Sequence, residues 1–169
     1  VIVRGKNDDE IIPLVEFALE KGLDISFIEE MPMGDIGSRD RQHTMVTSEE
    51  IKEVISAVYS ILPSAETSAG PSRYYRIAGS DIRIGFISPN SHNFCESCNR
   101  VRVTSEGRLL LCLGNEHSVD LKAVIRRYPG DMDKLKTTIV EAMDIKPERH
   151  YFYDDDKPQV VRLMNVTGG

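Results

Sequence analysis

The sequence predicts a mixed α/β chain in two parts, and two observations support this. First, residues 1–28 read as a strand, an amphipathic helix and a second strand, which is the pattern of a βαβ unit. Second, all three cysteines of the 169-residue chain fall within residues 92–117, in a stretch that predicts a β-hairpin. Because small residues mark a linker between these regions, we divide the chain into residues 1–63 and residues 64–169.

Helix and strand signals define the first part. Gly22 follows the apolar positions of the first helix and supplies its C-terminal stop. Thr47 and Glu50 form a capping box in front of an amphipathic helix, which Pro63 is expected to end. The predicted elements are strands at 1–3 and 25–28 and helices at 11–21 and 47–62.

The second part combines hairpin and helix signals. Gly79 lies between two alternating strands, and Pro129-Gly130 breaks the last helical stretch into two helices. The predicted elements are a linker at 64–72, strands at 74–78, 82–87, 101–104 and 108–113, and helices at 119–127 and 131–143. The remaining tail is polar and ends in two glycines.

Two carboxylates and a methionine follow the strand at 25–28. Glu29, Glu30 and Met31 occupy the position where βα units carry their chemistry. Solvated loop carboxylates and a core-filling methionine are the simpler interpretation. Neighbouring residues of a strand also face opposite ways. We therefore assign no role to the two carboxylates on this position alone.

The composition excludes several classes of function. The net charge is -6, with both signs interleaved along the chain, which argues against nucleic acid as a partner. No apolar run approaches the ~18 residues of a membrane span, so we expect no membrane association. Three clustered cysteines without a disulfide framework indicate a reducing compartment, and we expect a cytoplasmic protein.

The three cysteines read Cys-x2-Cys-x13-Cys, and the predicted hairpin folds the third back toward the first two. If Thr104 pairs with Arg108 across the glycine-containing loop, the register places Cys112 opposite Arg100. Because opposed residues of an antiparallel pair share a face, Cys112, Arg100 and Arg102 should lie on one side. The other side should supply core from Val101, Val103, Leu109 and Leu111.

Three thiols beside two guanidinium groups suit several kinds of site. Soft sulfur ligands favour zinc or an iron-sulfur cluster, and three of them leave one coordination position open. The alternatives are a structural zinc site closed by His92 or His117, a disulfide with one free thiol, and an open iron-sulfur cluster. The two arginines favour the open cluster, because a structural zinc site has no need of them. The candidate metal ligands are Cys95, Cys98 and Cys112.

Several motifs occur together in this chain: Phe27-Ile-Glu-Glu-Met31, Gly70-Pro-Ser-Arg-Tyr-Tyr75, Gly85-Phe-Ile-Ser88, Cys95-x2-Cys98-Asn-Arg100-x-Arg102-x-Thr104 with Cys112, and Gly168-Gly169. Together they resemble the molybdenum cofactor biosynthesis protein A family, the radical SAM GTP 3',8-cyclases, over essentially the whole chain. The resemblance implies the C-terminal βα units of an incomplete TIM-type barrel in residues 1–63. An α+β auxiliary-cluster and GTP-binding domain would follow in residues 64–169.

The resemblance also implies a set of site residues. Cys95, Cys98 and Cys112 would hold an auxiliary 4Fe-4S cluster, whose fourth iron lacks a protein ligand and binds the guanine edge of GTP. The implied GTP-binding residues are Arg100, Val101, Arg102, Gly168 and Gly169, and the implied S-adenosylmethionine contact is Met31. Ser26 stands where the family often has an arginine, so the chain departs from the family at one usual substrate contact.

The implied reaction begins with reductive cleavage of S-adenosylmethionine to a 5'-deoxyadenosyl radical. This radical removes hydrogen from ribose C3' of GTP, and that carbon attacks guanine C8. The family's radical-generating Cys-x3-Cys-x2-Cys motif, which binds a second 4Fe-4S cluster, lies in an N-terminal half that this chain lacks. We therefore expect a C-terminal piece of a longer protein that is inactive alone. Its open strand edges could pair two copies as a homodimer.

Overall fold

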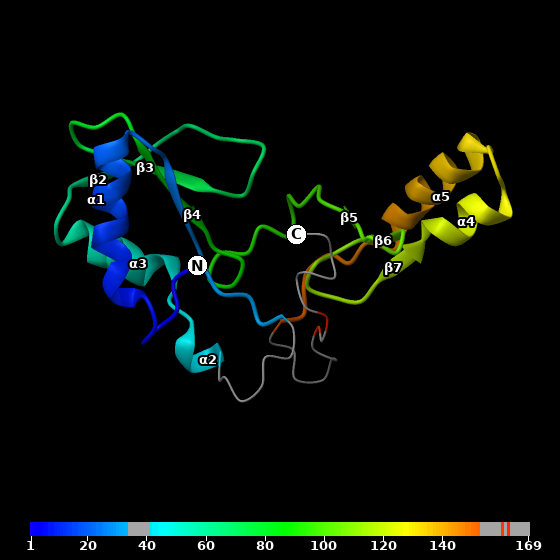
Figure 1. Cartoon of the computed structure of the whole chain (residues 1–169), viewed down its shortest axis with the longest axis horizontal. Coiled ribbons are helices and arrows are strands. Elements are labelled where there is room, and N and C mark those ends of the chain that lie inside the picture. Colours follow the sequence, from blue (N-terminus) through cyan, green and yellow to red (C-terminus); the bar gives the residue numbers. More distant parts are fainter. Residues whose placement is uncertain (34–40, 153–159, 161, 163–169) are drawn as a thin grey trace. The chain divides into compact units, whose positions relative to one another are not determined.

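The computed structural model describes residues 1–33, 41–152, 160 and 162. These residues form a mixed α/β structure with two sheets and helices packed on them (Figure 1). The chain divides into two compact units: the first comprises residues 1–31 and 38–94, and the second comprises residues 32–37 and 95–169. Among the described residues, no helix combines the length and the apolar character that crossing a bilayer requires.

Helices and strands both contribute to the first unit, whose elements are η1 (Asp8–Glu10), α1 (Ile11–Lys21), β1 (Ile25–Ile28), α2 (Arg41–Thr44), α3 (Ser48–Ser56), β2 (Ile61–Pro63), β3 (Arg73–Ile77) and β4 (Arg83–Ile87). The strand order is β1-β4-β3-β2. β1 runs parallel to β4, with Phe27 opposite Phe86. β3 is antiparallel to both of its neighbours, so the hairpin predicted over residues 74–87 is confirmed.

The core of the first unit lies between this sheet and two helices. α1 and α3 lie side by side against the sheet (Figure 1). Alternation along the strands directs Phe27, Ile84 and Phe86 toward the buried Val15 and Ile55 of the two helices. The opposite face of β1 carries Ser26, which is exposed.

The strand predicted at residues 1–3 is reduced to one bridge. Only Val3 pairs, with Met45, in an isolated antiparallel bridge. The chain turns immediately afterwards: the Val3 N–H donates to the side-chain oxygen of Asn7 at 2.8 Å, and the Lys6 N–H donates to the Val3 carbonyl at 3.0 Å. The turn uses the backbone groups that a longer ladder would need, so the prediction of a full strand is wrong.

The helix predicted at residues 47–62, which is α3 in the structure, starts where expected but ends earlier. The Thr47 hydroxyl accepts a hydrogen bond from the Glu50 N–H, and the Glu50 carboxylate accepts one from the Thr47 N–H, so the capping box is confirmed. The helix ends at Ser56 rather than at Pro63, and residues 61–63 form β2. Because β2 is an edge strand, Pro63 is tolerated there despite its missing N–H.

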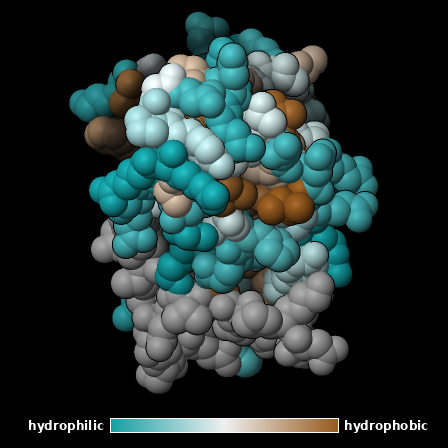
Figure 2. Space-filling view, turned by 90° about the vertical axis from the view of Figure 1, so that its right-hand side faces the viewer, coloured by the Kyte–Doolittle hydropathy of each residue, from teal (hydrophilic) through white to brown (hydrophobic). Residues whose placement is uncertain are grey.

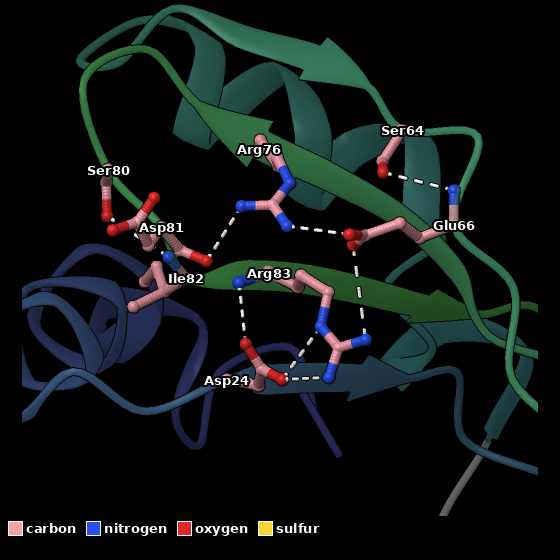
Figure 3. A network of polar contacts seen from close by, with 8 residues as sticks. All are labelled: Asp24, Ser64, Glu66, Arg76, Ser80, Asp81, Ile82 and Arg83. Atoms are coloured by element: carbon pink, nitrogen blue, oxygen red, sulfur yellow. Dashed lines mark hydrogen bonds and ion pairs between the residues drawn. The ribbon is translucent and has the colours of Figure 1, made fainter.

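The predicted linker at residues 64–72 is tied back to the sheet. Glu66 pairs with Arg76 at 2.8 Å and lies 4.0 Å from Arg83 (Figure 3). Arg83 also pairs with Asp24, which immediately precedes β1. The predicted division after residue 63 therefore falls within one sheet, because β2 and β3 on either side of it pair with each other.

The second unit is a three-stranded antiparallel sheet covered by two helices. Its elements are β5 (Arg102–Val103), β6 (Arg108–Leu110), β7 (Ser118–Asp120), α4 (Leu121–Arg127) and α5 (Met132–Asp144), with the strand order β5-β6-β7. Both helices were predicted, and Asp120 and Asp131 cap them by accepting hydrogen bonds from backbone N–H groups at 2.8 Å. The buried residues of the core are Leu109, Leu111, Leu121 and Ala142.

The surface of α4 and α5 carries isolated apolar side chains. Seen from this side, hydrophilic residues dominate the surface and the apolar ones form small groups (Figure 2). Ile125 and Val140 are among the exposed apolar residues, at 50% and 68% exposure. Scattered exposure of this kind is ordinary for a protein surface and needs no partner to explain it.

Candidate functional site

The cysteine hairpin forms in the predicted register. Arg102 lies opposite Leu110 and Val103 opposite Leu109, and the Thr104 N–H donates to the Arg108 carbonyl at 2.9 Å. The connecting loop requires a glycine, because Gly107 has a φ of 80°. Continued by two residues, this register would place Cys112 opposite Arg100, but the described ladder ends at the pair of Arg102 and Leu110.

One part of the hairpin prediction is wrong. Val101 and Val103 were expected in the core, yet they are 43% and 56% exposed. Leu109 and Leu111 are buried as expected. The difference arises because α4 and α5 pack on the side of β6, whereas β5 is an edge strand outside their cover.

Beyond the paired residues, a lysine side chain connects the two arms of the hairpin. The Lys146 ammonium donates to the Arg100 carbonyl at 2.9 Å and to the Leu111 carbonyl at 2.5 Å. One cation therefore bridges the chain segment that follows Cys98 and the segment that contains Cys112. We call residues 111–115 the Cys112 loop.

The Cys112 thiol is partly buried and has polar and charged groups around it. The Gly114 N–H donates to its sulfur at 3.4 Å. Burial raises the pKa of Cys112, the neighbouring thiols of Cys95 and Cys98 raise it further, and the Gly114 N–H and the Lys146 charge act against them. Cys95 and Cys98 therefore both contribute to the electrostatic environment of Cys112.

The other two cysteines lie on one tight turn, in which the Cys98 N–H donates to the Cys95 carbonyl at 3.0 Å. Cys95, Cys98 and Cys112 are all half-buried free thiols. The disulfide considered from the sequence is therefore absent. His92 and His117, the alternative fourth ligands for zinc, are both exposed.

Among the described residues, no three side chains of His, Cys, Asp or Glu are close enough together to hold a metal ion. Convergence of the three thiols on one metal centre thus stays a prediction. The donor set nevertheless fits such a centre, because three free thiols supply the soft sulfur ligands that zinc and iron-sulfur clusters prefer.

The two arginines of the predicted site differ in environment. Arg100 is exposed, whereas Arg102 is half-buried on β5. Within the described part of the chain, no acidic side chain pairs with Arg102. A partly desolvated guanidinium without a counter-ion favours binding of an anion. Val101, which lies between Arg100 and Arg102 in the sequence, is exposed. Gly168 and Gly169 fall outside the described residues.

Glu29 is a buried structural residue, so its interpretation as a solvated loop carboxylate is wrong. It is 1% exposed, and its carboxylate accepts hydrogen bonds from the N–H groups of Ser48, Asn90 and Ser91 at 2.9 to 3.0 Å. The Ser91 hydroxyl donates to it as well. Burial alone would raise the pKa of Glu29, but these hydrogen bonds outweigh burial and hold it below its ordinary value. Met31, two residues later, ends the first segment of the first unit.

A family model described as Molybdenum Cofactor Synthesis C matches residues 23–152. The chain belongs to this family. The matched residues include both sheets and all three cysteines. The hairpin, the three thiols and the two arginines therefore lie within the region that defines the family.

Proteins named GTP 3',8-cyclase are similar to the whole chain. The protein of Marinobacter nauticus is 56% identical over 169 residues, that of Pseudomonas fluorescens 58% over 170 residues, and that of Ectopseudomonas mendocina 51% over 169 residues. Each match covers 100% of this chain and 51% of the relative. The chain thus spans about half the length of these relatives.

Proposed function

We propose that this chain is the C-terminal half of a GTP 3',8-cyclase, which converts GTP to 3',8-cyclo-7,8-dihydroguanosine triphosphate in molybdenum cofactor biosynthesis. The family and the names of the relatives support this assignment. The observation that carries the proposed role of this half is the presence, in one compact unit, of three free thiols and of Arg102, which is half-buried and has no acidic partner among the residues that the structure describes.

The two parts of the chain would have different roles. Residues 1–63 would supply the last βα units of a radical SAM partial barrel. The strand β1, with α1 and α3 packed on one face of the sheet, supports this role, although β1 pairs in parallel with β4 from residues 64–169. Residues 64–169 would hold the auxiliary cluster and GTP, because every predicted metal and nucleotide ligand lies there.

Cys95, Cys98 and Cys112 are the residues that would hold an auxiliary 4Fe-4S cluster. When bound, this cluster supplies a Lewis-acidic iron, while S-adenosylmethionine and a second cluster supply the one-electron chemistry of cyclisation. The three thiols match the sulfur ligation that such clusters require. Gly114 contributes a hydrogen bond to the Cys112 sulfur, a contact of the kind that tunes iron-sulfur centres.

The guanidinium groups of Arg100 and Arg102 would bind oxygens of GTP. Each presents a planar set of N–H donors that suits phosphate and carbonyl oxygens. Val101 would contribute an apolar contact between them, and Gly168 and Gly169 would approach the substrate closely because they lack Cβ atoms. Binding of this kind fixes the orientation of the nucleotide, which lowers the entropic part of the barrier to ring closure.

The N-terminal half would supply the remaining machinery. All three cysteines of this chain are assigned to the auxiliary cluster, so none remains for a radical-generating Cys-x3-Cys-x2-Cys motif. Met31 would contact S-adenosylmethionine at the carboxyl end of β1, where βα units place their functional loops. We therefore propose that the isolated chain does not cleave S-adenosylmethionine.

Anaerobic reconstitution of the full-length protein with iron and sulfide tests this function. Replacing all three of Cys95, Cys98 and Cys112 by alanine should remove about four iron atoms per chain and leave the other cluster in place. Ser105→Ala, in the loop of the same hairpin, is the matched control and should keep full iron content. Zinc in place of iron, or the same iron content in the triple variant, would refute the proposal.

A further inference from the structure

Arg162 makes an extensive set of contacts with the Cys112 loop. Its side chain is 12% exposed and forms an ion pair with Glu116. Its other terminal nitrogen donates to the carbonyls of Leu113 and Asn115, at 3.0 and 2.6 Å, and more weakly to that of Cys112 at 3.4 Å. A planar guanidinium can reach several acceptors at once, whereas an ammonium cannot do so with fixed geometry.

Lys146 holds the beginning of the same loop. It donates to the Leu111 carbonyl, and it also donates to the Arg100 carbonyl on the other arm of the hairpin. Together the two cations satisfy the carbonyl groups of four residues, Leu111, Cys112, Leu113 and Asn115. Both come from the segment that follows α5, and neither belongs to the predicted metal or GTP ligands.

The backbone of this loop depends on such donors. The ladder between β5 and β6 ends at Leu110, so carbonyls beyond it lack strand partners from β5. A buried carbonyl without a donor costs free energy comparable to a lost hydrogen bond. Charged side-chain donors supply stronger hydrogen bonds than neutral ones, and they impose no strand conformation on the loop.

We propose that Lys146 and Arg162 are positioning residues, which hold the backbone of the Cys112 loop so that the third thiol faces the Arg100 segment. The importance of this position for GTP rests on the proposed function, whereas the support of the loop is a property of the fold alone. Arg162 stands seven residues before Gly169 in the sequence. The same contact therefore couples the loop of the third cysteine to the start of the C-terminal tail.

Hydrogen exchange of the metal-free, full-length protein tests the support of the loop without relying on a cluster. Lys146→Met should speed exchange of the amides in residues 111–117 by about tenfold, because two charged hydrogen bonds are lost. Lys146→Arg keeps the charge and the donors, and it should restore most of the protection. Lys136→Met, on an exposed position of α5, should match the wild type.

Arg162 is tested in the same way with two replacements. Arg162→Gln should increase exchange in the Cys112 loop by a similar factor of about ten. Arg162→Lys should recover only part of it, because a single ammonium cannot contact three carbonyls and Glu116 together. Arg126→Gln, at an exposed position of α4, is the control. Exchange in α1 and α3 should be unchanged in every variant, which separates a local effect from unfolding.

The outcomes distinguish this inference from the proposed function. Unchanged exchange in both Lys146→Met and Arg162→Gln would overturn it, whatever iron and GTP do. Faster exchange in the loop supports it even if the wild type binds neither iron nor GTP, in which case only the proposed function fails. In reconstituted protein, the two variants should also shift the electron paramagnetic resonance spectrum of the auxiliary cluster, and the two controls should not.

Discussion

Glu29 accepts hydrogen bonds from both the backbone N–H and the hydroxyl of Ser91, 62 residues further along the chain. The same carboxylate also accepts from Ser48, at the start of α3. One buried side chain therefore joins the end of β1, the start of a helix and the segment after β4. Met31 and Cys95 follow two of these segments closely, so Glu29 fixes the points where the chain leaves the first unit.

Glu29→Gln should destabilise the protein by about 2 to 3 kcal/mol, because an amide cannot accept all four hydrogen bonds and places its own N–H groups against donors. Urea denaturation of the purified protein measures the loss. Glu20→Gln, at an exposed carboxylate that pairs with neighbouring Lys21, is the matched control and should change stability by less than about 0.5 kcal/mol. Equal effects of the two substitutions would contradict the role given to Glu29.

The contribution of Glu29 should depend on pH with a definite sign. Its pKa in the folded protein lies below the ordinary value of 4.5, so the folded state releases this proton more readily than the unfolded state. The stabilisation is therefore complete above pH 4.5 and is lost as the pH falls through the lowered pKa. The difference in unfolding free energy between wild type and Glu29→Gln should be constant at neutral pH and shrink in acid. A difference that grows in acid would rule this out.

The ion pair between Asp24 and Arg83 should contribute much less, although it also joins the start of β1 to β4 (Figure 3). The hydrogen bond from Arg83 lowers the pKa of Asp24, yet the Asp24 side chain is 42% exposed. Asp24→Asn should cost only about 0.2 to 1 kcal/mol, and less at high salt. Denaturation at low and high ionic strength measures it. A loss as large as that of Glu29→Gln would show that burial is not the deciding factor.

Gly114→Ala should disturb the Cys112 loop. A Cβ at this position would lie 2.5 Å from the Cβ of His150 and 2.8 Å from the Phe152 ring. Because neither atom is the end of a flexible side chain, the backbone must shift and the hydrogen bond from the Gly114 N–H to the Cys112 sulfur should weaken. Hydrogen exchange of the loop and iron content after reconstitution both report this shift.

The control for Gly114→Ala is Gly79→Ala. A Cβ at Gly79 meets nothing within 4 Å, although the φ of 81° is unfavourable for alanine. It should therefore cost about 1 kcal/mol in stability and leave exchange and iron uptake at the Cys112 loop unchanged. If both variants affected the loop equally, the close packing of Gly114 would not be the cause.

The sequence predicted the local features of this fold well. The cysteine hairpin register followed from a short loop whose glycine adopts positive φ, because such a loop fixes which residues pair. The capping box located the start of α3 for a similar reason. The end of α3 was not predicted correctly, because the apolar residues Ile61 and Leu62 fit a helix or an edge strand equally well.

Features that depend on distant contacts could not be predicted. The exposure of Val103 depends on whether α4 and α5 cover β5 as well as β6, and the local sequence does not indicate this. Lys146 contacts a carbonyl 46 positions away, and Arg162 contacts carbonyls 47 to 50 positions away. Backbone carbonyls are the same in every residue, so such pairs leave no signal in a single sequence. The burial of Glu29 is a further case, since its partners are mainly backbone N–H groups.

In the proposed site, three thiols hold a metal centre and two arginines beside it bind GTP. The most direct measurement is a GTP titration of the reconstituted full-length protein, followed through the electron paramagnetic resonance spectrum of the auxiliary cluster. GTP should shift this spectrum, and Arg102→Ala should raise the GTP concentration required by roughly 10- to 150-fold. A spectrum that GTP leaves unchanged, or an Arg102→Ala variant that binds GTP like the wild type, would contradict the claim.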